Sequence, residues 1–289
     1  VILSVRPTMV FIPHPLDNHP DHYATYCFVT STLDQLITES KIKKDSIKIL
    51  TYLVHRGDWP AAANDLDPVL SPPHFLTQGD TRWLSLPLPD EITIAKKDAI
   101  KCYKTQTNIE KDFLSRFARP NEIFGAVKLN VAAVVPKSYI TFQADNTKWH
   151  GIVPVISDPI GDYFVADLSR GGDVRSVYAA TDKRMLFLRI DFAGRLSKRI
   201  QYNIAIKNPD SSDDVSTIEM NIDKLRYTQP ENLMWSYNMN TLQLAIQKKS
   251  IGKANDIYIK ITTKLSGLTV DNTGWRSIHL PDIISKKHT

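Results

Sequence analysis

The pattern of apolar residues changes near residue 125, and this change constrains the fold more than any other feature of the sequence. Before it, "TMVFIP" at 8–13 and "IKILTYLVH" at 47–55 are short apolar runs with the length of buried strands. Between them, residues 22–39 place apolar side chains three and four apart, as on one face of a helix. Strands that alternate with helices predict an α/β layered domain over residues 1–125.

Residues 126–289 carry a different pattern. Short runs rich in β-branched and aromatic residues follow one another, and Asn, Asp, Gly, Ser and Pro separate them. Many short strands with turn residues between them predict an all-β antiparallel sandwich as a second domain. The runs are "VKLNVAAVV", "DYFVADL", "MLFLRIDF", "IQYNIAI", "STIEMNI", "TLQLAIQ" and "DIYIKITTKL".

The end of the first domain contains a proline-rich connection, residues 60–90, and then a long helical stretch, residues 91–118. Long connections inside a domain are usually functional or disordered, so we expect this one to cross near a site. The hydrophobic content of 42% is ordinary for a soluble globular protein.

Charge and apolar runs argue against two classes of partner. The net charge is +5, but Lys and Arg do not gather into an aromatic-interleaved stripe, so we expect no nucleic-acid binding. No apolar run approaches the roughly 18 residues that a membrane span needs, and no signal-peptide pattern is present. The two cysteines, Cys27 and Cys102, are expected to be buried free thiols, which leaves the compartment open.

The segment "VFIPHPLDNHPDHYAT" joins the first strand to the first helix. Ligands bind at the carboxyl ends of strands in open α/β sheets, so Asp17, His19, Asp21 and His22 lie where a site is expected. One interpretation is that one of the two histidines, His19 or His22, binds a metal while the other faces the substrate. Asp21 would then orient a ring N–H. The alternative is that Asp21 caps the helix and the histidines are merely exposed. The spacing alone leaves both open.

The wider segment "PTMVFIPHPLDNHPDHYAT" resembles the second metal motif of the LmbE/PIG-L family of zinc-dependent N-acetyl-sugar deacetylases. In that motif a strand is followed by an Asp and then by His-Pro-Asp-His. Further on, "KKDAIKCYKTQTNIEKDFLSRFARPNEIF" resembles the late helix of the same family. The resemblance covers residues 1–125. It implies a partial Rossmann-like layer fold, zinc as the cofactor, and an N-acetylated sugar or glycoconjugate as the substrate.

The resemblance also implies a role for each motif residue. His22 matches the zinc ligand, and His19 matches the histidine that polarises the substrate carbonyl. Asp21 matches the residue that supports the histidine. Asp17 matches a common family position whose role is either structural or to hold a metal ligand in place without binding the metal. Zinc-bound water would attack the N-acetyl carbonyl and release acetate.

One family motif is missing. The His-Pro-Asp-Asp that supplies two further zinc ligands and the general base does not occur, and "FIPHPLDNHP" lacks the adjacent aspartate pair. We therefore expect the chain to be the C-terminal part of a longer protein, whose missing N-terminal segment completes the site. The chain alone would then be inactive. The alternative is a non-catalytic carbohydrate-binding protein with a degenerate deacetylase domain.

A few residues in and after the next predicted strand are further candidates for contact with a sugar. His55 and Arg56 follow a predicted strand and are predicted to contact the sugar, although an ordinary surface loop is an equal alternative. Trp59 and Trp83 are interpreted as packing residues rather than as sugar-stacking ones.

The second domain has a resemblance of its own. "VISDPIGDYFVADLSRGGDVRSVYAATDKRMLFLRIDFAG", with a turn at 182–184 before a strand, is similar to DOMON-like sandwiches and to carbohydrate-binding modules of family nine. This implies glycan binding and slightly favours an extracytoplasmic or cell-surface location; a structural or dimerising module is the alternative. The candidate stacking residues, each with core packing as the alternative, are Trp149, Trp235, Tyr237 and Trp275.

Overall fold

The chain divides into two compact units, which together form a mixed α and β protein with several sheets. The first unit holds most of residues 1–127, and the second holds residues 128–289 with the short stretches 33–35 and 78–80, whereas the sequence predicted a boundary after residue 125. A computed structural model describes residues 1–57, 59–61, 68–109, 113–126, 130–137, 146–165, 170–209, 211, 216–222, 233–252 and 255–281.

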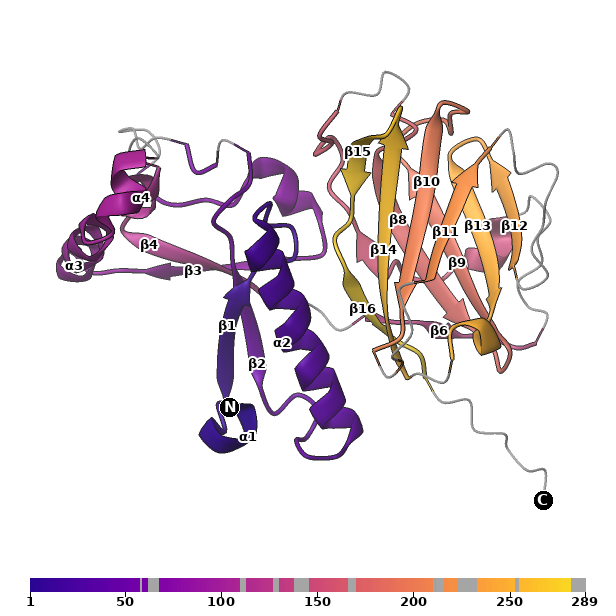
Figure 1. The fold of residues 1–289 in the computed structure, drawn as a ribbon, viewed down its shortest axis with the longest axis horizontal. Coiled ribbons are helices and arrows are strands. Elements are labelled where there is room, and N and C mark those ends of the chain that lie inside the picture. Colours follow the sequence, from indigo (N-terminus) through magenta and orange to yellow (C-terminus); the bar gives the residue numbers. More distant parts are fainter. Residues whose placement is uncertain are drawn as a thin grey trace. The chain divides into compact units, whose positions relative to one another are not determined.

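The first unit is built on a four-stranded sheet with the order β1-β2-β4-β3 (Figure 1). The strands β1 (Met9–Pro13) and β2 (Lys48–Tyr52) are parallel, and the helix α2 (Pro20–Thr38) connects them. The strand β4 (Asn121–Ala126) pairs antiparallel with both β2 and β3 (Arg82–Pro87). The other elements are α1 (Ile2–Val5), η1 (His74–Gln78), α3 (Asp90–Lys101), α4 (Lys104–Ile109) and η2 (Leu114–Phe117).

The long helix predicted over residues 91–118 is wrong as a single element. Helix α3 ends at Lys101, and the chain continues as the short elements α4 and η2. Pro120 then cannot continue a helix, and Asn121 begins β4 instead. The Asn121 amide exchanges two hydrogen bonds with the backbone of Leu70, at 2.6 and 2.8 Å, which fixes the proline-rich connection against this strand.

The second unit contains two six-stranded sheets. One has the order β11-β10-β14-β16-β5, with β15 paired to β14, and the other has the order β12-β13-β9-β8-β6, with β7 paired to β8. Pairing is antiparallel except between β5 and β16 and between β6 and β8. The strands are β5 (Asn130–Val131), β6 (Ala133–Val134), β7 (Ile156–Ser157), β8 (Val174–Thr181), β9 (Met185–Phe192), β10 (Ile200–Lys207), β11 (Ser216–Asn221), β12 (Leu233–Asn238), β13 (Thr241–Gln247), β14 (Asp256–Leu265), β15 (Leu268–Asn272) and β16 (Arg276–His279).

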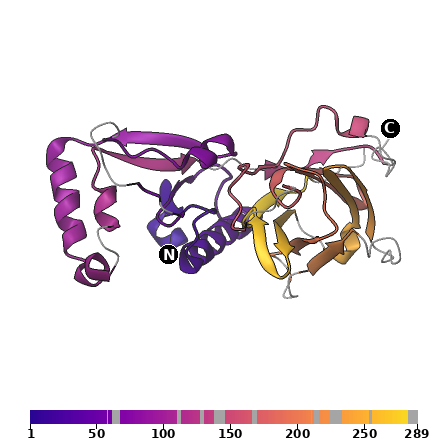
Figure 2. The ribbon, with the colours of Figure 1, turned by 90° about the horizontal axis from the view of Figure 1, so that it is seen from above.

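Both sheets contribute side chains to one buried core, and Figure 2 shows their strands arranged around a common interior. Leu188 and Ile190 of β9 share this core with Ile204 of β10 and Ile259 of β14. Phe187 points to the other face of β9, where it packs with the buried Trp149 in a separate cluster. The first half of the run "MLFLRIDF" is apolar on both faces because each face of β9 is covered there, whereas Arg189 and Asp191 form an ion pair further along the second face.

Strand predictions in the second half of the chain were largely confirmed. The runs at 185–192, 241–247 and 256–265 match β9, β13 and β14 residue for residue, and the runs that begin at 200 and 216 match β10 and β11 to within one residue. The run "DYFVADL" was predicted as a strand, but residues 162–165 form none, and its last three residues lie outside the described part.

Two further expectations concerned the burial of the cysteines and the lack of a membrane span. Both cysteines are free, but Cys27 is only half-buried and Cys102 is exposed, so the expected burial of the thiols was wrong. None of the helices in the described ranges has both the length and the apolar character that a membrane span requires.

Tyr202 offers a test of how the second unit is held together. Its side chain is fully buried; the hydroxyl donates to the Gly171 carbonyl at 3.0 Å and accepts from the Ser197 amide at 2.9 Å. Tyr202→Phe leaves both partners without this bond, so we expect a loss of about 1–3 kcal/mol in unfolding free energy, measured by urea denaturation. The control Tyr237→Phe removes a more exposed hydroxyl and is expected to change stability by less than about 0.5 kcal/mol. Equal effects of the two variants would contradict this account.

Candidate functional site

The loop between β1 and α2 begins with a histidine that belongs to the core. His14 is fully buried, and its Nδ1 accepts a hydrogen bond from the Leu16 amide at 3.1 Å. Its Nε2 lies 3.0 Å from the Thr81 hydroxyl, and its ring stacks on Trp83 at 5.2 Å. With both nitrogens engaged, His14 positions the loop and Trp83 packs against it.

Asp17 connects the loops that follow the two parallel strands. Its side chain is buried; Oδ1 accepts from the His19 amide at 2.9 Å, and Oδ2 accepts from the amides of Val54 and His55 at 2.8 and 3.0 Å. Backbone amides that converge on one carboxylate make charge-assisted hydrogen bonds. Asp17 therefore fixes the loop after β1 to the loop after β2.

The same carboxylate lies against His22. Oδ1 of Asp17 is 3.2 Å from Nδ1 of His22, an ion-pair distance without the angle of a hydrogen bond. The Nδ1 atom is buried and has no hydrogen-bond partner. A carboxylate next to one imidazole nitrogen is the usual means of orienting a histidine whose other nitrogen binds a metal.

His19 caps the helix α2 with its own side chain. Its Nδ1 accepts a hydrogen bond from the Asp21 amide at 3.2 Å, and its carbonyl accepts from the Tyr23 amide. The alternative in which Asp21 caps the helix is therefore wrong; Asp21 is an exposed residue of the first turn, and its supporting role stays a prediction. Because Nδ1 accepts, neutral His19 carries its proton on Nε2, which is then a donor.

Three imidazoles gather where β1 and β2 end. The ring centroids of His19 and His22 are 4.8 Å apart, and the His55 centroid is 5.3 Å from each of them. His55 also stacks on Phe113 at 5.4 Å with an interplanar angle of 14°. Side chains of two adjacent parallel strands thus meet at their carboxyl ends, as the strand order requires.

Arg56 and Trp59 are engaged within the same unit. Arg56 is 6% exposed; its Nη1 donates to Oδ1 of Asn18 at 2.9 Å, and its guanidinium lies over the Phe75 ring. A sugar contact by Arg56 stays a prediction, and what the structure shows is a packing role. Trp59 donates from Nε1 to the Ser71 carbonyl at 2.7 Å and packs on a small core.

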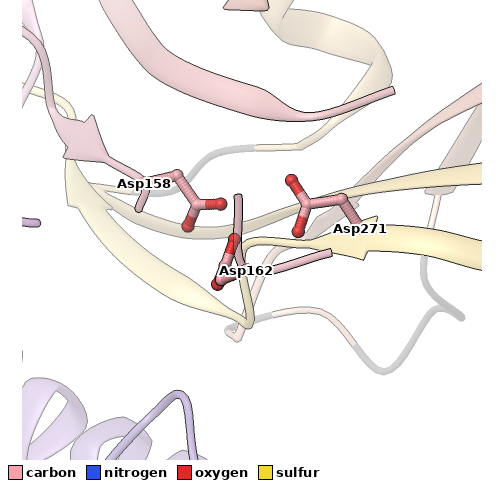
Figure 3. Close-up of side chains that lie close together, drawn as sticks. All are labelled: Asp158, Asp162 and Asp271. Atoms are coloured by element: carbon pink, nitrogen blue, oxygen red, sulfur yellow. The ribbon is translucent and has the colours of Figure 1, made fainter. Parts of the chain in front are cut away.

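The second unit holds a separate cluster of carboxylates that sequence reasoning missed. In the described part of the chain, the group of three or more His, Cys, Asp or Glu residues with ligand atoms within 4.8 Å of one another is Asp158, Asp162 and Asp271 (Figure 3). We call it the acidic triad. These three buried residues can hold a metal ion. The three imidazoles of the first unit do not form such a group, so the described residues do not assemble a zinc ligand set around His22.

The acidic triad comes from two segments, the stretch 158–162 after β7 and the strand β15. Asp158 follows β7, Asp162 follows the turn at Gly161, and Asp271 lies on β15; they are 3%, 9% and 0% exposed. The pairing of β15 with β14 shifts between Thr269 and Asp271, which is a bulge. A bulge places two consecutive side chains on one side of a strand, which explains why Asp271 is buried beside the apolar Val270.

Burial and mutual repulsion shift the titration of the acidic triad. Burial raises the pKa of Asp158 well above its usual range; the carboxylates of Asp271 and Asp162 raise it further, and Arg276 opposes them. Burial also raises the pKa of Asp271 to about 7, and Asp162 adds to the shift. Hydrogen bonds from the amides of Val174 and Asn272 to Asp271, at 2.7 and 2.6 Å, act in the opposite direction.

The aromatic candidates of the second unit differ in exposure. Trp149 is 3% exposed and donates to Oε1 of Gln243 at 3.0 Å, so it is a core residue. Trp235 packs against the main core and stacks with Tyr237 at 6.0 Å, and Tyr237 is 37% exposed. The Trp275 ring faces the Lys260 ammonium at 5.1 Å.

No family model matches the chain, and no curated protein matches it.

Proposed function

We propose that the first unit contributes to a zinc-dependent deacetylase that acts on an N-acetylated sugar or glycoconjugate, with a partial LmbE/PIG-L-like layer fold. We further propose that the second unit is a β-sandwich attached to it that binds glycan. The observation that supports this best is the paired orientation of His19 and His22 where β1 and β2 end. One imidazole has its Nδ1 occupied by the Asp21 amide, and the other is backed by a buried carboxylate.

His19 is suited to contact a substrate carbonyl. The Asp21 amide occupies Nδ1, so the proton of the neutral ring is on Nε2. A donor held on the first residue before a helix has a fixed direction, and a fixed donor stabilises the oxyanion that forms when an amide is attacked. This is the role that the family resemblance implies for His19.

His22 is suited to bind a metal through Nε2, because Asp17 lies against its other nitrogen. Zinc bound there would lower the pKa of a coordinated water and supply the attacking hydroxide. A catalytic zinc takes three protein ligands, so the proposal requires two ligands from outside the described residues.

A second function competes with this one. The imidazole nitrogens of His19, His22 and His55 do not form a group that shares one ion, which favours a carbohydrate-binding protein without hydrolytic activity. In that case, the imidazoles and the neighbouring Phe113 would contact a sugar as hydrogen-bonding and stacking groups.

Acetate release from N-acetylglucosaminides by the natural gene product distinguishes the two functions. We expect equal amounts of acetate and free amine, abolition of the reaction by a zinc chelator, and its recovery when Zn²⁺ is added back, since zinc would activate the water. Release that survives chelation would contradict a zinc enzyme. A protein that bound the sugar but released no acetate would support the binding function instead.

A further inference from the structure

The acidic triad is chemically unlike the histidine site. We propose that Asp158, Asp162 and Asp271 bind one Ca²⁺ ion within the second unit, and that this ion is independent of the proposed zinc. The proposal does not depend on the deacetylase function, because the argument uses only residues of the second unit.

The spread of the ligand atoms fits Ca²⁺. One carboxylate oxygen of each triad residue lies within 4.8 Å of those of the other two. Oxygen ligands bind Ca²⁺ at about 2.3–2.6 Å, so ligands on opposite sides of the ion are up to about 4.6–5.2 Å apart. Mg²⁺ binds at shorter distances, about 2.0–2.1 Å, and keeps several waters, which a buried site does not favour.

Asp158 supplies an observation beyond the clustering of acidic residues. Its side chain is 97% buried, since 3% is exposed, and neither carboxylate oxygen has a hydrogen-bond partner. Figure 3 shows this carboxylate directed toward those of Asp162 and Asp271. A buried carboxylate with no donor is strongly unfavourable, and a cation between the three groups removes that cost.

The backbone holds the other carboxylates in place. Two amides, of Val174 and Asn272, hydrogen-bond the oxygens of Asp271, and the bulge in β15 directs it inward. The amide of Gly161, a residue with φ of 87°, donates to both oxygens of Asp173 at 3.2 and 3.1 Å. That contact fixes the turn which carries Asp162, so the geometry is set before an ion arrives.

Charge and ligand type favour a hard divalent cation. Arg276 is 1% exposed, and its buried positive charge lowers the pKa of Asp158, while its Nε lies 3.8 Å from a carboxylate oxygen of Asp80. Carboxylate oxygens alone suit Ca²⁺, Mg²⁺ or Mn²⁺, whereas zinc sites usually include nitrogen or sulfur. An ion at this place would join the segment 158–162 to β15 and stabilise the second unit.

The test uses the full chain stripped of metal and compares wild type, Asp158→Asn and Glu219→Gln. Glu219 is an exposed carboxylate of β11, so its variant is a matched change of charge. For wild type and Glu219→Gln, titration calorimetry should give one Ca²⁺ per chain, and saturating Ca²⁺ should raise Tm by about 5 °C or more over chelator. Asp158→Asn should show neither effect.

In chelator the order of stability should reverse, with Asp158→Asn at least as stable as wild type, because the substitution removes a buried carboxylate that has no hydrogen-bond partner. This crossover is not expected of a carboxylate with a purely structural role. The proposal is overturned if wild type has the same Tm in Ca²⁺ and chelator. Binding of Mg²⁺ but not Ca²⁺, or Ca²⁺ binding that persists in Asp158→Asn, would overturn it too.

Discussion

Asp17→Ala should lower the unfolding free energy of the first unit by about 3–5 kcal/mol, one of the largest effects that a single substitution in this chain can produce. Three backbone amides, those of His19, Val54 and His55, would lose their shared acceptor. Each buried donor left without a partner costs about 1–3 kcal/mol, and part of this is recovered when the loop relaxes. The two loops would then separate, and His19 and His55 would lose their alignment.

Hydrogen exchange measures this effect locally, which matters because the chain has two units that need not unfold together. The amides of Val54 and His55 should exchange faster in Asp17→Ala, while amides of β9 and β14 in the second unit should keep their protection. Asp17→Asn retains one acceptor oxygen and should give an intermediate loss. Asp98→Ala is the control, because Asp98 is exposed and its ion pair is with Lys101 on the same helix. A loss no larger for Asp17→Ala than for the control would rule out this role of Asp17.

The parts of the fold that could be predicted from the sequence depend on local periodicity. The runs that became β1, β2 and α2 each carry their own pattern, and a strand–helix–strand order leads to parallel pairing without further information. The strands β9, β13 and β14 were identified for the same reason, since their apolar residues and flanking turns lie within a few positions of one another.

The elements that were missed depend on contacts between distant residues. Apolar residues at helical spacing after residue 101 suggested one long helix, but α3 ends at Lys101 and two short separate elements, α4 and η2, follow it. The strand β3, in "RWLSLP", is hidden among prolines and is defined by its pairing with β4. The β-propensity of a segment does not indicate which strand it will pair with.

The two sites differ in how much the sequence reveals. His19 and His22 are three residues apart and follow a predicted strand, so their location was predictable. The capping bond of His19 and the contact of Asp17 with the β2 loop were not, because they depend on backbone geometry. The acidic triad joins Asp158 to Asp271 across more than a hundred residues. A bulge at Val270 turns Asp271 inward, and no periodicity indicates a bulge.

His22→Ala and His19→Asn should impair the proposed deacetylase in different ways. His22→Ala removes a metal ligand, so zinc content and acetate release should both be lost. Asparagine at position 19 is a good helix cap and should keep α2 intact, but it lacks the imidazole donor. We therefore expect His19→Asn to bind zinc normally, with kcat about 10²–10³-fold lower and KM little changed, because the missing hydrogen bond acts mainly on the oxyanion.

The control for both variants is His74→Gln, because His74 is an exposed histidine of η1 that takes no part in the imidazole cluster. Its zinc content and kcat should equal those of wild type. The critical comparison is between the two imidazoles 4.8 Å apart, since a purely structural role would make both variants lose zinc and activity in parallel. Zinc lost in His19→Asn but retained in His22→Ala would reverse the assigned roles. Full activity in both variants would show that the His-Pro-Asp-His segment is not a catalytic site, and the carbohydrate-binding function would then account better for the clustered rings.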